Sequence, residues 1–513
     1  MPLSEKQYHE ICNACDRVLM ASDSTMERVA IPWLHVIREH PVFLENYAEL
    51  FGLSTTKQGF CRGLSGKART LAVYARQVAR AFREKGRLWY CNKQLPNKVD
   101  FLFVSHLLNA SQAAQPHDFY FGDAPDQLTD QGFSTAIVLI NHTGKHGSTF
   151  GDQWKESAVP RIILSDSMPF YEEHELCRRL KRESNRLQME ATSQTCDLDR
   201  AVCLRAAQEA LLSGSVGTLR MASQISNLIS ETHSSTLVLT HEGHAWERIV
   251  FASVRRVNPN IRCVGYQHAA VFLRQHAIRR GLAPEYNPSH IVTAGSVGKR
   301  QLEGSPGLSG ISISILGSNR NVPSIPNDVR SNSSDIHGEK NQSTCLVLPE
   351  GLPSECHCLF NFSLDCAIAF PKIQFIWRLH PLIEFKSLVL QNPKLKNLPP
   401  NICFSNDPLA GDFARSEFVL YRGSTAAVQA VAAGLRPIYL RLSEDEMTID
   451  PMYEIQDCIH QVASKIDFGV AMDRATGFKN KSNEASRSAA QRYCEDFFGE
   501  LAPSVLSKIG SHP

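Results

Sequence analysis

The chain has 513 residues, which is too long for one compact core and predicts two or three domains. Its 43% hydrophobic and 21% charged residues are typical of a soluble globular protein. A net charge of +2 gives no broad electrostatic reason to expect nucleic acid as a partner. No stretch approaches the roughly 20 uncharged apolar residues that cross a bilayer, and the N-terminus lacks a signal-peptide core. We therefore expect a cytoplasmic protein.

The first 95 residues have a helical pattern. In ERVAIPWLHVIREHPVFLENYAELF, from 27 to 51, apolar residues recur at mixed three- and four-residue spacing without strand alternation. The 15 cysteines are scattered, which favours reduced and mostly buried thiols. Cys12 with Cys15 has CxxC spacing, and Cys356 lies close to Cys358, but no second pair follows at zinc-finger distance. Helix packing explains these cysteines better than a metal or redox site.

Residues 96–317 contain five short apolar segments, and each is followed by polar residues or glycine. Buried parallel strands have this pattern when they deliver polar residues at their carboxyl ends. The expected strands lie in KVDFLFVSHL, FSTAIVLINHTG, STLVLTHEG, IRCVGYQHA and SHIVTAGS. With helical segments between several of them, they predict a doubly wound parallel α/β sheet, a Rossmann-like first domain.

A second set of alternating elements follows a region rich in Ser, Asn, Pro and Gly, 318–343, which we interpret as a linker. Residues 344–470 then predict a second Rossmann-like domain, with strands in STCLVL, QFIWRL, SEFVLY and LRPIYL. Residues 471–513 are expected to form a helical tail interrupted by proline. Two such domains place a cleft between the carboxyl ends of two parallel sheets, where ligands of these sheets bind.

The stretch THEGHAWERIV places several polar residues at the end of an expected first-domain strand. Gly243 allows a tight turn, and Glu242 can serve there as a general base towards a hydroxyl group. An equally weighted alternative is structural, with Glu242 capping the following helix and Glu247 pairing with an arginine such as Arg248 or Arg255. The remaining residues expected to line this side of the cleft are His241, Trp246, Gln267 and His268.

Two expected strand ends in the second domain carry residues suited to a phosphate. QFIWRLHP ends with Arg378 and His380, and YRGSTAAVQAVAAG supplies Arg422, Gly423, Ser424 and Thr425 at the start of a helix. The N–H groups, hydroxyls and dipole of a helix N-terminus bind phosphate, and arginine or histidine adds charge-assisted contacts. A plain helix cap and a proline-terminated strand are the structural alternatives for these two motifs.

With these motifs, residues 98–445 resemble the GT-B glycosyltransferases of bacterial surface-carbohydrate biosynthesis, the O-antigen and capsule type. THEGHAWERIV followed by CVGYQHAAV carries most of this resemblance. The order Glu-Gly, His-Pro and Ser-Thr is also similar to that of bacterial sialyl- and Kdo-type transferases, which use CMP-activated sugars. The resemblance implies Glu242 as the catalytic base, and His380, Ser424 and Thr425 as contacts to the nucleotide phosphate, with His380 stabilising the leaving group.

The chain differs from that family pattern at two positions, His241, where an acidic residue is usual, and Ala269, where glycine is usual. Polyglycerolphosphate transferases, which use a CDP-activated donor, have a similar motif order, so polyol-phosphate transfer is the alternative reaction. Nucleotide-sugar binding without turnover is a third interpretation.

The resemblance implies a nucleotide-activated sugar and a saccharide or lipid-linked saccharide acceptor as partners, with peripheral contact to the inner membrane face. We expect no cofactor and no metal, because no Asp-x-Asp follows an expected strand and the spacing of His241 and His244 does not fit a zinc helix. The basic stretch CRRLKRESNR, 177–186, has the pattern of a solvated helix face more than that of a membrane contact.

Overall fold

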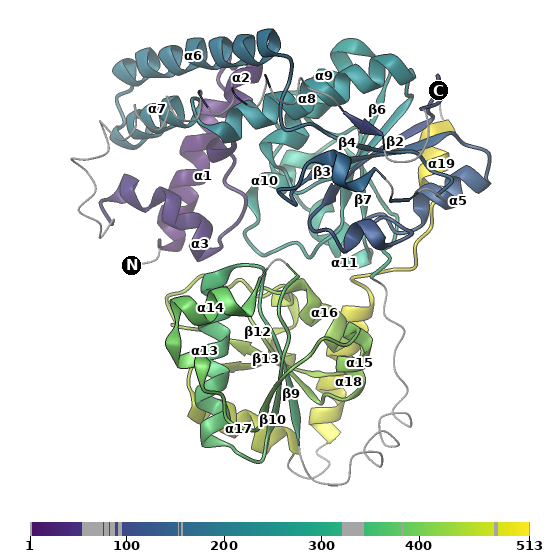
Figure 1. The fold of residues 1–513 in the computed structure, drawn as a ribbon. Helices are drawn as coiled ribbons and strands as arrows, with labels where there is room; N and C mark the ends of the chain where they lie inside the picture. Colours follow the sequence, from purple (N-terminus) through teal and green to yellow (C-terminus); the bar gives the residue numbers. More distant parts are fainter. Residues whose placement is uncertain are drawn as a thin grey trace.

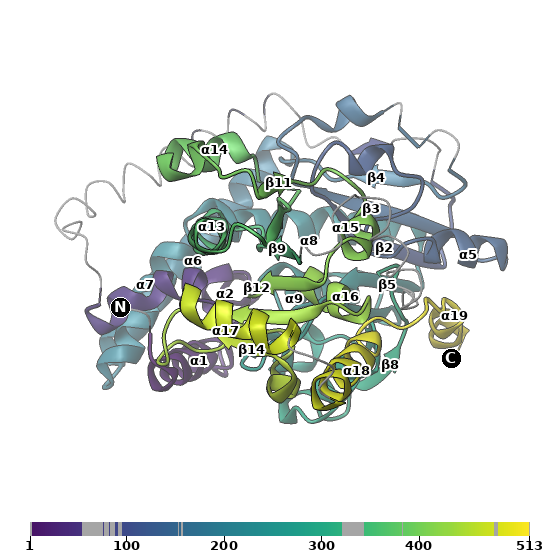
Figure 2. The same cartoon turned by 90° about the horizontal axis from the view of Figure 1, so that it is seen from below.

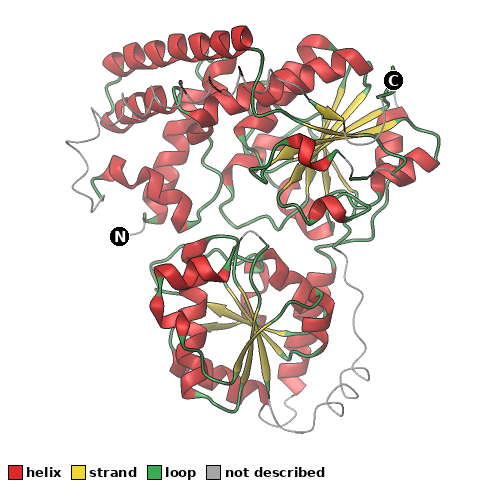
Figure 3. Ribbon diagram, in the orientation of Figure 1, coloured by secondary structure: helices red, strands yellow, loops and turns green. Residues whose placement is uncertain are grey.

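The computed structural model describes residues 3–53, 88–90, 95–320, 343–476 and 481–511, with the isolated positions 75, 79 and 82 and without 152, 155, 156 and 382. Two α/β units lie one above the other, and additional helices extend the upper unit to one side (Figures 1 and 3). The two Rossmann-like domains and the helical N-terminal segment expected from the sequence are confirmed.

The first domain is built on one eight-stranded sheet with the order β1-β4-β3-β2-β5-β6-β7-β8. All neighbouring strands are parallel except the edge pair β1 and β4. The strands are β1 (Trp89–Tyr90), β2 (Phe101–Leu107), β3 (Thr135–Asn141), β4 (Arg161–Ile163), β5 (Thr236–Thr240), β6 (Arg262–Gln267), β7 (His290–Thr293) and β8 (Ser312–Ile315). The central strands are buried on both faces, which explains why their sequences are continuous apolar runs.

Helices cover both faces of this sheet and also form a separate group beside it. The helices of the first domain are α5 (Ala124–Asp130), α6 (Phe170–Ser193), α7 (Asp197–Glu209), α8 (Ser213–Thr232), α9 (Ala245–Val257), α10 (His276–Arg279) and α11 (Ser296–Glu303). The chain passes through α6, α7 and α8 between β4 and β5, and α6 with α7 lies beside the N-terminal helices (Figure 1).

The N-terminal helices are part of the first domain's core. They are α1 (Glu5–Leu19), α2 (Met26–Val29) and α3 (Pro41–Leu44), and their apolar residues share one cluster with α6 to α9 and with β2, β3 and β5. Arg28 is fully buried and donates to Glu183 at 2.7 Å, with Glu190 at 2.9 Å. A buried cation needs such partners, so this ion pair fixes α2 against α6.

The second domain has a six-stranded, fully parallel sheet with the order β11-β10-β9-β12-β13-β14. The strands are β9 (Thr344–Leu348), β10 (Gln374–Trp377), β11 (Ile402–Phe404), β12 (Phe418–Tyr421), β13 (Arg436–Leu440) and β14 (His460–Val462). The helices are α13 (Pro353–Ala369), α14 (Phe385–Gln391), α15 (Leu409–Ala414), α16 (Thr425–Ala432) and α17 (Lys465–Thr476). Seen from below, this sheet runs across the view between its covering helices (Figure 2).

Short 3-10 helices occur in both domains: Pro32–Leu34, Glu45–Phe51, Gln112–Ala114, Gly147–Phe150, Pro284–Tyr286, Pro306–Leu308, Pro393–Lys396 and Tyr453–Cys458. The last of these lies at the boundary between the domains. Its Glu454 pairs with Arg300 of α11 at 2.6 Å.

The C-terminal tail joins both domains and forms no unit of its own. The expected domain boundary at 470 falls inside α17, and α18 (Lys481–Glu495) packs against α16. The chain then returns to the first domain, where the Ala502 N–H donates to the Leu316 carbonyl at 2.7 Å. Its last helix, α19 (Ser504–Ser511), lies against β2, with Gly510 next to the ring of Phe101. The expected linker, 318–343, lies almost wholly outside the described residues.

Candidate active site

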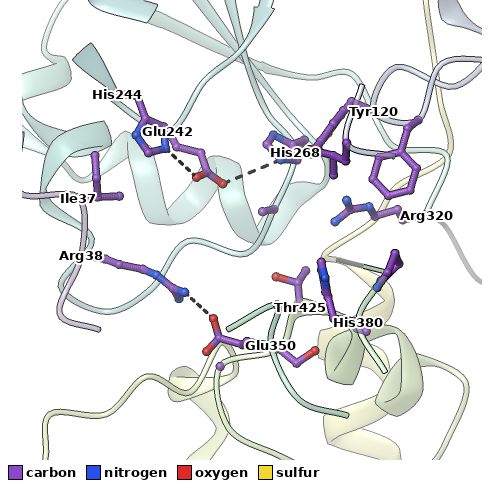
Figure 4. A pocket seen from close by; sticks show the side chains of 18 of the residues that line it. Ile37, Arg38, Tyr120, Glu242, His244, His268, Arg320, Glu350, His380 and Thr425 are labelled. Carbon is purple, nitrogen blue, oxygen red and sulfur yellow. Dashed lines mark hydrogen bonds and ion pairs between the residues drawn. The ribbon is translucent and has the colours of Figure 1, made fainter. Parts of the chain in front are cut away.

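A cleft of about 1380 Å³ lies between the two domains, at the carboxyl ends of both sheets. The turn after β5 and the loop after β6 line its upper side, while the turns after β9, β10 and β12 line its lower side. Figure 4 shows Glu242, His244 and His268 on the upper side, and Glu350, His380 and Thr425 below them. Residues that follow strand ends therefore meet here from both sheets, as in other doubly wound folds.

The turn after β5 is held from inside by Glu247. The carboxylate of Glu247 accepts the backbone N–H groups of Glu242 (3.0 Å), Gly243 (2.7 Å) and His244 (3.0 Å), and it contacts His241 Nδ1 at 2.8 Å. Glu247 is the N3 residue of α9, so it both caps this helix and fixes the turn. The capping role expected of Glu242 in the structural alternative thus belongs to Glu247, and the Glu242 side chain is left in the cleft.

Gly243 permits this turn for two reasons. Its φ of +87° lies in the region that favours glycine, and a Cβ atom would come within 2.2 Å of the Ala277 backbone. The glycine therefore allows the tight turn from which Glu242 enters the cleft.

Two histidines surround the Glu242 carboxylate, with His244 Nε2 at 3.4 Å and His268 Nε2 at 3.9 Å (Figure 4). Burial acts to raise the pKa of Glu242, but the hydrogen bond from His244 and the nearby positive charges outweigh it and lower the pKa. Burial lowers the pKa of His268 to about 4. At neutral pH, Glu242 is therefore ionised beside a neutral His268.

The N-terminus of α16 faces the cleft from the second domain. Gly423 follows β12, Ser424 is the N-cap residue, and Thr425 begins the helix. The Ser424 side chain makes no capping hydrogen bond, and the described residues provide no hydrogen-bond partner for the Thr425 hydroxyl. Two hydroxyls and the free N–H groups of a helix N-terminus are together suited to bind a phosphate.

His380 lies beside this N-terminus, after β10. The glycine after β9, Gly351, leaves room for its ring, because a Cβ atom there would be 2.7 Å from His380 Nδ1. Burial lowers the pKa of His380, so its ring is neutral at pH 7 and can donate one N–H. Among the residues expected at the donor site, His380, Gly423, Ser424 and Thr425 thus meet at one side of the cleft.

The two arginines expected at the donor site have other partners. Arg422 is only 2% exposed, donates to Glu355 (2.7 Å) and Glu446 (2.6 Å), and does not line the cleft. Arg378 does line the cleft, but its guanidinium donates to Asp412 at 2.6 Å. The expectation of a phosphate contact from Arg422 is corrected by these contacts, since strand β12 directs this side chain into the ion-pair cluster.

Of the first-domain residues expected to line the cleft, some do so and others are buried behind its surface. Trp246 and His268 line it, whereas Gly243 lies behind the turn, packed against Ala277. His241, Glu247 and Gln267 are buried below the cleft: 0%, 1% and 4% of their surfaces are exposed. His241 and Glu247 contact each other behind the turn, and Gln267 packs against Gly298 of α11.

Three charged residues that the sequence analysis did not identify also line the cleft. Arg38, from the N-terminal segment, donates from Nη2 to Glu350 Oε2 at 2.6 Å across the domain boundary. Arg320 lies near Tyr120, His268 and His380 on the opposite side (Figure 4). Glu350 lies two residues after the end of β9, so the pattern of polar residues after strands could have identified it, but no such pattern marks Arg38 or Arg320.

His40, Glu350 and Glu355 bring three potential metal-ligand atoms within 4.8 Å of one another. The Nδ1 atom of His40 accepts the Val42 N–H at 3.2 Å, which assigns the proton to Nε2, the atom that faces Glu350 at 3.3 Å. A protonated nitrogen cannot bind a metal, and arginines already pair with both carboxylates. These residues therefore form an ion-pair cluster.

Two other features singled out in the sequence, the Cys12–Cys15 pair and the basic stretch 177–186, have structural contacts. Cys12 and Cys15 are buried in α1, and burial raises the pKa of the Cys12 thiol to about 12. In the basic stretch of α6, Arg178 pairs with Glu175, and Arg179 with Glu27. Among the described residues, no helix combines the length and apolar character that crossing a membrane requires.

No family model matches the sequence, and no curated protein matches it. Among solved structures, the glycotransferase of kitacinnamycin is similar with a TM-score of 0.47 at 10% identity, covering 81% of this chain and 100% of that one. The spinosyn rhamnosyltransferase SpnG, complexed with thymidine diphosphate, is similar with a TM-score of 0.46 at 10% identity, covering 81% of this chain and 100% of that one. Anabaena HepE, in complex with UDP and glucose, is similar with a TM-score of 0.45 at 12% identity, again covering 81% of this chain and 100% of that one. Similarities at this level say nothing about a donor or acceptor of this chain.

Proposed function

We propose that the protein is a glycosyltransferase that moves a sugar from a nucleotide-activated donor to a saccharide acceptor. One observation carries this proposal: an ionised carboxylate of one domain, Glu242, shares a cleft with the hydroxyls, helix N-terminus and histidine of the other. A base and a phosphate site facing each other are what sugar transfer from a nucleotide requires.

The reaction proceeds by direct displacement at the anomeric carbon of the donor sugar. The acceptor oxygen forms the new bond to that carbon as the bond from the carbon to the phosphate oxygen breaks. The acceptor proton passes to Glu242, and the electron pair of the broken bond remains on the nucleotide phosphate. His380 and the N-terminus of α16 stabilise the charge that grows there, with Ser424 and Thr425 donating from their hydroxyls.

Glu242 accepts a proton only in its ionised form, and its lowered pKa keeps that form populated at neutral pH. The same lowered pKa makes the carboxylate a weak base, because general-base catalysis is most effective when the pKa lies near the working pH. We therefore place its contribution at the lower end of the usual range, about 10²-fold. Closing of the domains, which excludes water, would supply part of the remaining rate enhancement.

For the donor we favour a CMP-activated sugar, and for the acceptor a surface polysaccharide or glycolipid, on the basis of the motif resemblance. Such an acceptor places the enzyme in the cytoplasm or at the inner membrane face. No metal or other cofactor takes part in this proposal, since the helix N-terminus and the side chains supply the neutralising groups.

The first test is a thermal-shift panel of CMP, CDP, UDP, GDP and ADP. A nucleotide that binds the native state raises the melting temperature, and we expect CMP to do so in the wild type but not in His380→Ala. His460→Ala is the matched control, because His460 lies at the start of β14, away from the cleft. If no nucleotide shifts the wild type, the proposal is wrong.

Turnover separates the enzyme from a binding protein. Glu242→Gln removes the proton acceptor with little change in shape, so we expect CMP binding to persist while sugar transfer falls about 10²-fold. Equal transfer by the variant and the wild type would remove Glu242 from the reaction. Release of CMP from a CDP-linked polyol donor would instead identify polyol-phosphate transfer, and nucleotide binding with no product would identify a binding protein.

A further inference from the structure

Arg320 differs from the other two arginines that line the cleft. Arg38 has a carboxylate partner in Glu350, and Arg378 has one in Asp412. For Arg320, the described part of the chain offers no carboxylate partner, and its guanidinium instead lies 5.6 Å from the centre of the Phe119 ring. A partly buried cation without a counter-charge is costly, so this arrangement favours an anionic ligand.

The position of Arg320 is coupled to the phosphate site by the backbone. The Gln429 side chain donates from Nε2 to the Arg320 carbonyl at 3.0 Å. Gln429 lies four residues after Thr425 in α16, and such residues share one face of a helix. The same helix face therefore carries Thr425 and fixes the backbone of Arg320.

The residues before Arg320 are bound to the first domain. The Asn319 side chain donates to the Phe119 carbonyl at 3.0 Å, and the Ser318 N–H donates to the Gly499 carbonyl at 2.9 Å. Arg320 thus follows a segment attached to one domain, while its own carbonyl is attached to the other. An anion held by Arg320 and α16 together would stabilise this arrangement of the domains.

The positive charge of Arg320 affects two histidines that line the cleft. Burial is the largest cause of the lowered pKa of both His380 and His268. The carboxylates of Glu350 and Glu242, respectively, act to raise these pKa values, and the positive charge of Arg320 acts to lower both. Arg320 is therefore close enough to influence the histidine of the phosphate site and the histidine beside the base. Figure 4 shows its guanidinium between these two rings, directed into the cleft.

We propose that Arg320 binds the phosphate of the nucleotide donor and, together with Ser424, Thr425 and His380, completes the anion site. The identification of the ligand as a nucleotide rests on the proposed function. The contact itself requires only phosphate oxygens, which a guanidinium binds through two parallel N–H groups. During transfer, Arg320 would share the negative charge that grows on the leaving phosphate.

The test compares nucleotide and nucleoside affinities in Arg320→Gln, Arg320→Lys and the wild type, by calorimetric titration with CMP and cytidine. We expect Arg320→Gln to weaken CMP binding about 10- to 100-fold, as for the loss of a charged hydrogen bond, and Arg320→Lys to weaken it less. Cytidine has no phosphate, so its affinity should stay within about twofold. Arg300→Gln is the matched control, since Arg300 pairs with Glu454 at the domain boundary outside the cleft.

Each result decides one proposal. Unchanged CMP affinity in Arg320→Gln, or an equal loss for cytidine, would overturn the role of Arg320 and leave the proposed function intact. If neither CMP nor another nucleotide binds the wild type, the proposed function fails, and titration with inorganic pyrophosphate then decides the anion site. Pyrophosphate binding that is lost in Arg320→Gln supports the site, whereas no pyrophosphate binding by the wild type overturns it.

Discussion

Arg38 of the N-terminal segment and Glu350 of the second domain form an ion pair across the cleft, with 2.6 Å between Nη2 and Oε2. The guanidinium also lies 3.9 Å from the centre of the Phe272 ring, and 11% of its side chain is exposed. Burial acts to raise the pKa of Glu350, but the positive charge of Arg38 and the hydrogen bond from His40 outweigh it and lower the pKa to about 2. The N-terminal segment therefore contributes directly to the contact between the domains, through the loop that precedes α3.

A double-mutant cycle on Arg38→Gln and Glu350→Gln should reveal strong coupling. Each single change leaves a nearly buried charge without its partner and disturbs the contact between the domains beside the proposed anion site, so we expect each to weaken CMP binding. The double variant should lose less than the sum of the single losses, with a coupling free energy of about 1–3 kcal/mol. CMP dissociation constants of the four proteins give this energy.

The more exposed pair between Arg300 and Glu454 serves as the control for this cycle, because 57% and 30% of the two side chains are exposed. Exposed ion pairs contribute about 0–1 kcal/mol, so the same cycle on Arg300→Gln and Glu454→Gln should give a smaller coupling. Equal coupling in the two cycles would contradict a special role for Arg38 and Glu350.

The sequence was sufficient to predict the strands that are continuous apolar runs, but not the three-residue strands. β5 and β12 are continuous apolar runs because they are buried on both faces, and such runs can be recognised without a structure. β4, β11 and β14 have three residues each, too few to show any period. Their positions depend on pairing with neighbouring strands, which is a tertiary effect.

The position of some candidate site residues could also be predicted. Glu242 and His380 could be placed at the cleft because they follow recognisable strands, and parallel strands bring their carboxyl ends to one edge. Arg422 also follows a strand, yet its side chain turns into a cluster with Glu355 and Glu446, which no local pattern reveals. Arg38 reaches the cleft only through the packing of the N-terminal helices, so its position requires the whole fold.

The pH dependence of nucleotide binding should reveal the titration of His380. Burial lowers the pKa of this histidine below its ordinary value of about 6.5, and a bound phosphate would raise it again. The protonated ring binds the anion better, so CMP affinity should fall as pH rises from the pKa of the free protein through that of the complex. The expected slope is at most about tenfold per pH unit.

His380→Gln isolates this effect, because glutamine keeps an N–H donor but does not titrate. The phosphate of CMP titrates in the same range, and its contribution remains in the variant. CMP dissociation constants measured between pH 5 and 8 in both proteins should therefore differ in slope. Parallel pH profiles would exclude proton uptake by His380.

Glu247 should affect catalysis without contacting the substrate. Its buried carboxylate accepts three backbone N–H groups of the turn that carries Glu242. Glu247→Ala leaves these donors unsatisfied, at a cost of about 1–3 kcal/mol for each buried group, and the turn must rearrange. We expect kcat to fall at least tenfold while the affinity for CMP is retained, because the phosphate site lies on the other domain.

Glu303→Ala provides the comparison for this positioning residue, since Glu303 is largely exposed at the end of α11. The transfer rates and CMP affinities of the two variants distinguish misplacement of Glu242 from destabilisation of the whole fold. A simultaneous loss of rate and of CMP affinity in Glu247→Ala would indicate that the fold itself is damaged.

Asp450 should make the stability of the second domain depend on pH. Its Oδ1 atom accepts the Tyr421 hydroxyl (3.1 Å) and the Met452 N–H (2.9 Å), while the described residues offer no hydrogen-bond partner to its buried Oδ2 atom. Burial raises the pKa of this carboxyl to about 7, against about 3.9 in an unfolded chain. The folded state therefore favours the protonated form, and its stability is lost as pH rises from about 4 through 7. At about 1.4 kcal/mol per pKa unit, this loss of stability is about 4 kcal/mol at most.

Asp450→Asn keeps an acceptor for both donors and cannot ionise. We therefore expect the variant to melt about 2 °C or more above the wild type at pH 8, and at the same temperature as the wild type near pH 4. Calorimetric scans at these two pH values test this sign, with the exposed Asp457→Asn as the control. A variant that is less stable than the wild type at pH 8 would mean that Asp450 is ionised and paired in the fold, contrary to the contacts described.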